Sequence, residues 1–178
     1  MKHIFLTGDI QTGKSTIINR ALSGKEIVLG GYKTVGGLRR SDGNSYVHLL
    51  RADTYEQLSP QNRVLHRKPA YGRIKFEVNR ELYNTKGVSL LKNLPRNCQL
   101  ILMDEIGTRE KHCLPFRQAI MDTLDGDIPV LGVVQIRPDD FLDEIRSHPK
   151  VELITVTPQN REAVYHYVEQ HVAQLMTK

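Results

Sequence analysis

Short apolar runs recur along the chain, and most are followed by a segment in which apolar residues return at helical spacing. A continuous run of about four to eight apolar residues is typical of a strand buried on both faces, as in parallel sheets. We expect such strands at residues 3–7, 27–29, 99–105, 128–134 and 153–156. Helical spacing predicts helices over residues 15–22, 116–124, 139–146 and 159–176. Alternation of strands and helices favours a three-layer α/β fold with a mostly parallel central sheet.

The segment between residues 30 and 76 departs from this alternation. Four glycines within residues 30–37 predict turns, or backbone held close to a neighbour. Ser41–Asn44 is a hairpin turn between residues 38–40 and 46–50. Residues 51–71 show no clear period, so we expect a surface loop that serves as a lid or an insertion. The fold prediction therefore includes a β-hairpin and loop insertion.

Two weaker elements follow this insertion. Residues 72–76 predict a short strand. Asn79 is a candidate cap for a helix that continues to Leu91, although Gly87 is unfavourable inside it.

Composition limits the class of protein. The 178 residues suffice for one domain with a substantial core, so we expect a single domain over residues 1–178. The net charge of +5 is compatible with polyphosphate ligands and is weak support for nucleic acid. We find no apolar run long enough to span a membrane and no signal peptide, and Cys98 and Cys113 form no metal-type or disulfide pattern. A cytoplasmic monomer is expected.

A phosphate-binding pattern, G-x-x-x-x-G-K-S, begins directly after the first predicted strand. This motif is informative only between a strand and a helix, and the flanking residues predict that context. The predicted nucleotide-binding residues of the loop are Gly8, Asp9, Ile10, Gln11, Thr12, Gly13, Lys14, Ser15 and Thr16.

Each part of the loop has a chemical reason. Gly8 and Gly13 let the backbone approach an anion, and successive N–H groups with the new helix end favour negative charge. Lys14 supplies a positive charge for the β- and γ-phosphates, and the Ser15 hydroxyl is a ligand for Mg²⁺. A nucleoside triphosphate is thus the expected ligand, and Mg²⁺ the expected cofactor.

Asp104 and Glu105 end the apolar strand predicted at residues 99–105. Ligands of parallel α/β sheets lie at the carboxyl ends of strands, so both carboxylates should face the phosphate loop. Asp104 is predicted to hold Mg²⁺ together with Ser15. Glu105 is predicted to take a proton from a water that attacks the γ-phosphate, with Lys14 as the other catalytic residue.

These motifs resemble the small nucleoside-triphosphatase family known from thermophiles and, in animals, as cancer-related nucleoside-triphosphatase. The resemblance rests on Asp104-Glu105-Ile106-Gly107 with Glu110 and Phe116, and on three other stretches: residues 30–43, Glu144-Ile145-Arg146 with Val151, and Val156-Thr157 with Asn160-Arg161-Glu162. It spans most of the chain and is weakest over residues 51–71. It implies a phosphate-loop core and slow, Mg²⁺-dependent hydrolysis of ATP, GTP and other nucleoside triphosphates to the diphosphate and phosphate.

The chain departs from the family pattern at two places. The family's loop usually carries Pro-Pro-Gly or Pro-Gly-x where this chain has Asp9, Ile10 and Gln11, and its Lys-Met is here Thr108-Arg109. A carboxylate at Asp9 is unfavourable beside phosphates unless it points away or pairs with a base. Neither change removes a catalytic group, but each is expected to alter rate or substrate.

Two other functions share the phosphate loop. A small-molecule or nucleotide kinase needs a basic lid, for which Arg63, Arg67, Lys68 and Arg73 are candidates. A nucleotide switch or RNA-associated module would use the basic surface, although we find no RNA-type aromatic motif.

Several further polar residues have candidate roles. Arg109, Arg137 and Arg161 are candidates for an internal arginine finger that stabilises charge in the transition state. Asn160 and Arg161 are also predicted to contact the nucleotide, while a helix start is the other reading of Asn160.

Overall fold

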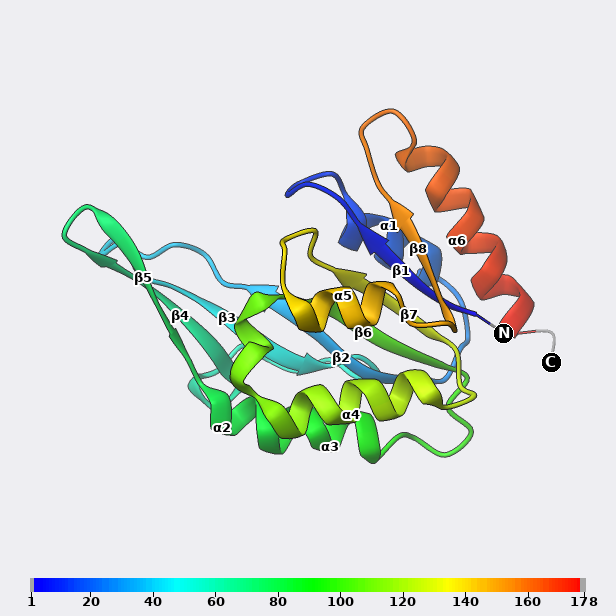
Figure 1. The fold of residues 1–178 in the computed structure, drawn as a ribbon, viewed down its shortest axis with the longest axis horizontal. Coiled ribbons are helices and arrows are strands. Elements are labelled where there is room, and N and C mark those ends of the chain that lie inside the picture. The colour runs from blue at the N-terminus through cyan, green and yellow to red at the C-terminus, as the bar shows by residue number, and fades with distance from the viewer. Residues whose placement is uncertain (1, 177–178) are drawn as a thin grey trace.

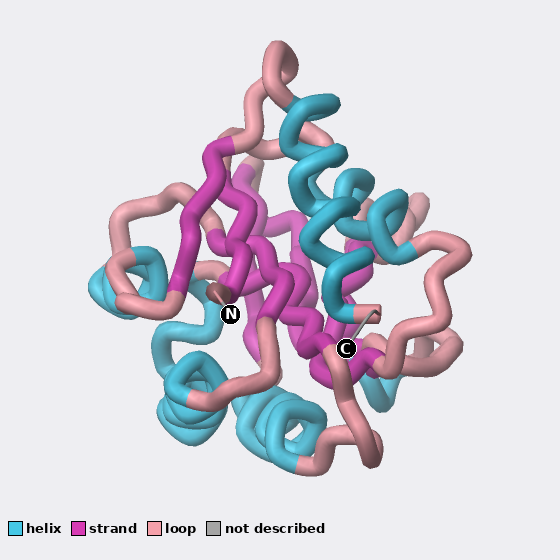
Figure 2. The backbone as a smooth tube through the Cα atoms, turned by 90° about the vertical axis from the view of Figure 1, so that its right-hand side faces the viewer, coloured by secondary structure: helices cyan, strands magenta, loops and turns pink. Residues whose placement is uncertain are grey.

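The computed structural model describes residues 2–176 and contains one eight-stranded sheet with helices on both faces (Figures 1 and 2). The strand order is β5-β4-β3-β2-β6-β7-β1-β8. The strands are β1 (His3–Thr7), β2 (Leu29–Gly36), β3 (Ser45–Arg51), β4 (Arg63–Ala70), β5 (Arg73–Val78), β6 (Leu100–Ile106), β7 (Val130–Val134) and β8 (Val151–Thr155). The helices are α1 (Lys14–Leu22), α2 (Arg80–Leu82), α3 (Val88–Lys92), α4 (Leu114–Asp125), α5 (Asp140–Arg146) and α6 (Arg161–Leu175).

Five neighbouring strands, β2, β6, β7, β1 and β8, pair in parallel. Their registers include Ile4 opposite Leu131 and Gly31 opposite Leu102. Every residue of β1 and β7 is buried, which is why these strands read as continuous apolar runs. The three-layer α/β prediction is confirmed, and the carboxyl ends of β1 and β6 share one edge of the sheet.

Two separate apolar clusters fix the layers. One cluster packs α1 and α6 against one face of the sheet through residues such as Ile4, Ile18 and Val168. The other packs α3, α4 and α5 against the opposite face around Phe5, Phe116 and Phe141. Figure 2 shows the sheet between these two groups of helices.

The glycine-rich segment at residues 30–37 is a strand and not a series of turns. A Cβ atom at Gly31, where φ is +85°, would lie 2.1 Å from the carbonyl oxygen of Leu102 on β6. The alternative prediction for this segment, that its glycines hold the backbone close to a neighbour, is therefore confirmed. The predicted hairpin is present, but its first arm is β2, and residues 38–40 belong to the connection.

The prediction of a loop over residues 51–71 is wrong for its second half. Residues 60–62 form a short 3₁₀ turn, and β4 pairs antiparallel with both β3 and β5. Only Val64 and Leu65 of β4 are buried, and Arg67, Lys68 and Pro69 are exposed, so the strand has no apolar alternation. Figure 1 shows why: the β4–β5 hairpin extends beyond the helices, and most of its surface faces water.

The helix expected after Asn79 is confirmed. The Asn79 side chain accepts a hydrogen bond from the Leu82 N–H at 3.1 Å, and a π-helical turn, Tyr83–Gly87, joins α2 to α3. A Cβ atom at Gly87 would lie 2.7 Å from the ring of Phe116 on α4. The glycine that is unfavourable for an isolated helix thus permits close packing here.

Candidate functional site

The phosphate loop joins β1 to α1, as its motif requires. Gly8, Gln11 and Gly13 have φ values of +122°, +65° and +94°, which fold the chain into a tight loop. A Cβ atom at Gly8 would lie 2.5 Å from the carbonyl oxygen of Val156, just beyond β8. At Gly13 a Cβ would meet nothing within 4 Å, so the glycine is needed for its backbone conformation.

Lys14 lies within its own loop and is almost fully buried. Its ammonium group donates to the carbonyl oxygens of Gly8 and Asp9, at 3.0 and 2.5 Å, and to Thr12 Oγ1 at 3.3 Å. The contact with Asp9 is to its backbone, and the Asp9 side chain is exposed. The positive charge is thus centred on the loop and is not neutralised by Asp9.

Asp104 lies beside the loop at the end of β6. The Ser15 hydroxyl donates to Asp104 Oδ1 at 3.2 Å. The two predicted metal ligands, which are 89 residues apart in the sequence, are thus in direct contact. Burial raises the pKa of Asp104 to about 6, and the charge of Glu105 acts in the same direction, whereas Ser15 and Lys14 oppose the rise. A buried carboxylate with a raised pKa beside a phosphate-binding loop is typical of a functional site.

Glu105 follows Asp104 through a cis peptide bond and turns to a different partner. Its Oε1 accepts a hydrogen bond from the side-chain amide of Gln135 at 2.5 Å. Its backbone N–H donates to the Thr34 hydroxyl at 3.2 Å. Glu105 is only half-buried and lines the same cleft as the loop, so its carboxylate is held but accessible.

The residues after β6 form a short 3₁₀ segment, Thr108–His112, which the sequence did not predict. It is anchored by the buried Glu110, whose carboxylate accepts from Gly107 N–H at 3.0 Å and from the Tyr83 hydroxyl at 2.9 Å. Burial raises the pKa of Glu110 to about 7. This anchor fixes the turn that carries Thr108 and Arg109 into the cleft.

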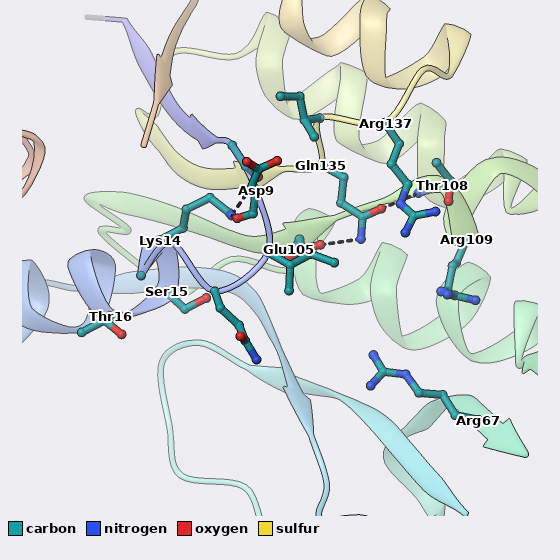
Figure 3. A pocket seen from close by; sticks show the side chains of 15 residues that line it. Asp9, Lys14, Ser15, Thr16, Arg67, Glu105, Thr108, Arg109, Gln135 and Arg137 are labelled. Atoms are coloured by element: carbon teal, nitrogen blue, oxygen red, sulfur yellow. Dashed lines mark hydrogen bonds between the residues drawn. The ribbon is translucent and has the colours of Figure 1, made fainter. Parts of the chain in front are cut away.

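The loop and the ends of β6 and β7 enclose a cleft of about 760 Å³ (Figure 3). Thr108, Arg109, Gln135, Ile136 and Arg137 line its far side, and Arg67 reaches it from β4. Of the four basic lid candidates, only Arg67 lines this cleft. Of the arginine-finger candidates, Arg109 and Arg137 lie there and Arg161 does not.

Asn160 and Arg161 lie at the start of α6. The Asn160 side chain accepts from Thr157 N–H at 2.8 Å and donates to the Thr155 carbonyl at 2.9 Å, so it closes the turn between β8 and α6. Neither residue lines the cleft, although this turn neighbours the loop through Val156 and Gly8. Their contact with a nucleotide stays a prediction.

Gln135 is the site residue that the sequence analysis missed. It follows the buried strand β7 directly, at the same sheet edge as Asp104 and Glu105. A polar residue immediately after a predicted parallel strand is a usable signal, because such strand ends border the ligand site. The contribution of Arg67 to the cleft needed the pairing of β4, which the sequence did not reveal.

A glycine loop between β1 and α1, with its serine bonded to an aspartate from a parallel strand end, defines a P-loop nucleotide-binding protein. A family profile described as NTPase matches residues 3–169, and the chain belongs to this family. The predicted resemblance to nucleoside-triphosphatases, and the class of enzyme that it implies, are therefore confirmed.

Individual relatives agree with this assignment. The chain is 28% identical to the mouse protein named cancer-related nucleoside-triphosphatase homolog, over 92% of each chain. It is also 28% identical to nucleoside-triphosphatase THEP1 of Methanosarcina barkeri, over 92% of this chain and 93% of that one.

Two solved structures share the fold. The crystal structure of THEP1 from Aquifex aeolicus matches with a TM-score of 0.73 at 21% identity, over 94% of this chain and 96% of that one. The solution structure of a human cancer-related nucleoside triphosphatase matches with a TM-score of 0.68 at 24% identity, over 100% and 99%. Among residues 2–176, every helix is too short or too polar to span a lipid bilayer.

Proposed function

We propose that this chain hydrolyses nucleoside 5′-triphosphates, ATP and GTP among them, to the diphosphate and phosphate with Mg²⁺, using Glu105 to activate water. The observation that carries the proposal is the position of Glu105. Gln135 holds its carboxylate in the cleft beside the phosphate loop, while Asp104 is bonded to Ser15. A positioned base beside a phosphate site is what transfer to water requires.

The chemistry of Ser15 and Asp104 fits Mg²⁺. Both offer oxygen atoms, and their hydrogen bond of 3.2 Å places them together at the start of α1. Within residues 2–176 we find no cluster of three or more His, Cys, Asp or Glu side chains able to hold a metal. This agrees with Mg²⁺, which proteins usually bind through one or two carboxylates together with substrate phosphates. When bound, the ion would neutralise charge on the phosphate oxygens.

The reaction follows from the residues. The loop N–H groups and Lys14 hold the β- and γ-phosphates, and Glu105 removes a proton from a water in line with the γ-phosphorus. The water oxygen forms a bond to that phosphorus, and the bond to the β,γ-bridging oxygen breaks. Glu105 then returns its proton to solvent. Arg109 and Arg137 are the arginine-finger candidates that line the cleft, and either would stabilise charge on the transferred group.

The test is phosphate release by Glu105→Gln at saturating Mg·ATP and Mg·GTP. Gln keeps the size of Glu but takes no proton, so turnover should fall roughly 10²–10⁴-fold, the usual effect of losing a positioned base. Nucleotide affinity, measured separately by calorimetry, should stay within a few-fold of wild type. Glu26→Gln is the matched control, because Glu26 is an exposed carboxylate away from the cleft.

Equal turnover by Glu105→Gln and wild type would remove Glu105 as the base. Formation of diphosphate only when an acceptor alcohol or nucleotide is added, with the phosphoryl group on the acceptor and no free phosphate, would instead support the kinase alternative. Arg67 in the cleft is the observation that favours that alternative.

A further inference from the structure

Three arginines from three different elements line one side of the cleft: Arg67 from β4, Arg109 from the Thr108–His112 turn, and Arg137 after β7. Figure 3 shows their side chains on the side of the cleft away from Lys14 and Ser15. The arginine ion pairs found within residues 2–176 belong to Arg20, Arg51, Arg117 and Arg146 instead. The protein therefore brings three positive charges together without a carboxylate ion-pair partner.

The β4–β5 hairpin fixes two of these groups relative to each other. Arg67 on β4 is directly opposite Phe76 on β5, so both side chains lie on the same face of the hairpin. The guanidinium carbon of Arg109 lies 3.6 Å from the centre of the Phe76 ring. The stacked ring orients Arg109 while leaving its N–H groups free to bind an oxyanion.

The nearby carboxylates accept hydrogen bonds from groups other than these arginines. Glu105 accepts from Gln135, and both oxygens of Glu110 accept from Tyr83 and Gly107. Burial lowers the pKa of Arg109, and the charges of Arg67 and Arg137 lower it further, although Glu110 opposes them. The unrelieved repulsion between these guanidinium groups would be removed by an anion bound between them.

A smaller pocket of about 220 Å³ adjoins the cleft at this point. The two share Arg67, Arg109, Glu105 and Gln135, so a path runs from the base Glu105 to the two arginines. Beyond them the small pocket is lined by Thr34, Gly36, Val47, Leu65, Tyr83, Gly107 and Glu110, whose carboxylate oxygens already accept from Tyr83 and Gly107. Its size suits a small anion better than a second nucleotide.

We propose that Arg67 and Arg109 form a second oxyanion site, separate from the glycine loop, that binds a tetrahedral phosphate group. Guanidinium groups match phosphate oxygens through paired N–H donors. The phosphate is either the inorganic phosphate released by hydrolysis, which would leave past Glu105, or the phosphate group of a second molecule. The site goes beyond the proposed hydrolysis because it binds without nucleotide.

The test measures binding of inorganic phosphate, by phosphorus NMR at constant ionic strength, to protein in which Lys14→Ala removes the loop's own charge. This variant should still bind phosphate saturably. Adding Arg67→Gln should weaken binding roughly 10- to 100-fold, the worth of one or two charge-assisted hydrogen bonds. Adding Arg73→Gln instead is the matched control: Arg73 lies on the same hairpin but outside both pockets, and binding should be unchanged.

Phe76→Leu tests the geometry. It keeps all charges but removes the ring under Arg109, so phosphate affinity should fall by a smaller factor than with Arg67→Gln.

A second titration, with phenyl phosphate, distinguishes the two sources of the phosphate group. Binding of inorganic phosphate alone would assign the site to the reaction product, and equal or tighter binding of the ester would assign it to a second molecule.

The proposal is overturned if Lys14→Ala abolishes phosphate binding, or if Arg67→Gln and Arg73→Gln weaken it equally. Thermal melts of each variant confirm that it is folded. Because the assay contains no nucleotide, either result leaves the Glu105→Gln test of hydrolysis intact.

Discussion

The side-chain amide of Gln135 links Glu105 to the turn at Thr108: its nitrogen donates to Glu105 at 2.5 Å, and its oxygen accepts from Thr108 N–H at 3.4 Å. A Cβ atom at Gly107 would lie 2.6 Å from this amide, so the preceding turn packs directly on it. Gln135 therefore fixes the position of the Glu105 carboxylate in the cleft.

Gln135→Leu should lower kcat roughly 10- to 100-fold, because a misplaced base loses most of its advantage. KM for Mg·ATP should change little, since the phosphate loop is untouched. Steady-state kinetics measure both values. Gln118→Leu on the exposed side of α4 is the control, and an equal fall in that variant, or a rise in KM alone, would contradict a positioning role.

Asp104→Asn should raise the Mg²⁺ concentration at half-maximal activity by roughly tenfold or more, because an amide is a weaker ligand for a hard cation. Nucleotide binding without Mg²⁺ should be almost unchanged, because Lys14 and the loop remain. The measurement is a Mg²⁺ titration of phosphate release beside metal-free calorimetry. A wild-type midpoint would show that Asp104 is not a metal ligand.

Lys14→Ala should lose most nucleotide affinity, because it removes the charge centred on the loop. Calorimetry with Mg·ATP tests this directly. Lys25→Ala, which changes a lysine beyond α1, serves as the control, and unchanged binding by Lys14→Ala would refute the phosphate-loop interpretation.

Glu110 should make stability depend on pH. Its pKa is about 7 in the fold against the ordinary 4.5, so between these values the folded protein holds a proton that the unfolded chain has released. The free energy of unfolding should therefore fall as the pH rises from about 4.5 to about 7, by roughly 3 kcal/mol for the full shift in pKa. Urea unfolding of wild type and Glu110→Gln from pH 5 to pH 8 should show the wild type losing stability relative to the variant, and a constant difference would exclude Glu110 as the cause.

Gly87→Ala should destabilise the fold despite the better helix propensity of alanine. The gain of up to about 1 kcal/mol in the helix is outweighed by roughly 1–3 kcal/mol of overpacking against Phe116. Phe116 is fully buried and lies within 5.4 Å of the Tyr32 ring centre and 5.2 Å of the Tyr83 ring centre, so its room to move is small. Gly36→Ala, where a Cβ meets nothing within 4 Å, is the control for urea unfolding.

The parts of the site built from contiguous residues were predictable from sequence. The loop from Gly8 to Thr16 and the Asp104–Glu105 pair each carry their chemistry within one short motif, and the flanking apolar runs place both at one sheet edge. The same local signals located β1, β6, β7 and β8 to within about two residues at each end, whereas the strand predicted at residues 27–29 shares only Leu29 with β2.

What the sequence did not reveal depends on pairing between distant segments. β4 is missing from the prediction because its outer residues face water and carry charge, so no burial pattern marks it. Only the pairing of β4 with β5 makes Arg67 and Phe76 neighbours. A sequence prediction that lacks β4 therefore cannot place the Phe76 ring under Arg109. Asn160 closes the turn before α6, in agreement with its reading as a helix start, and its contact with a nucleotide stays a prediction.

The exposed β4–β5 hairpin gives part of the cleft a separate local stability. β5 is the outermost strand, and nearly all its residues are exposed, so little apolar contact opposes its detachment. Such segments open at a lower free energy than the core and appear as early-exchanging units in amide hydrogen exchange. Each opening of β5 would withdraw Phe76 from Arg109, while Arg67 stays on β4, which also pairs with β3, and Glu105 stays on the parallel strands. The orientation of Arg109 in the proposed arginine site would then have a lower local stability than the proposed hydrolytic centre of the same chain.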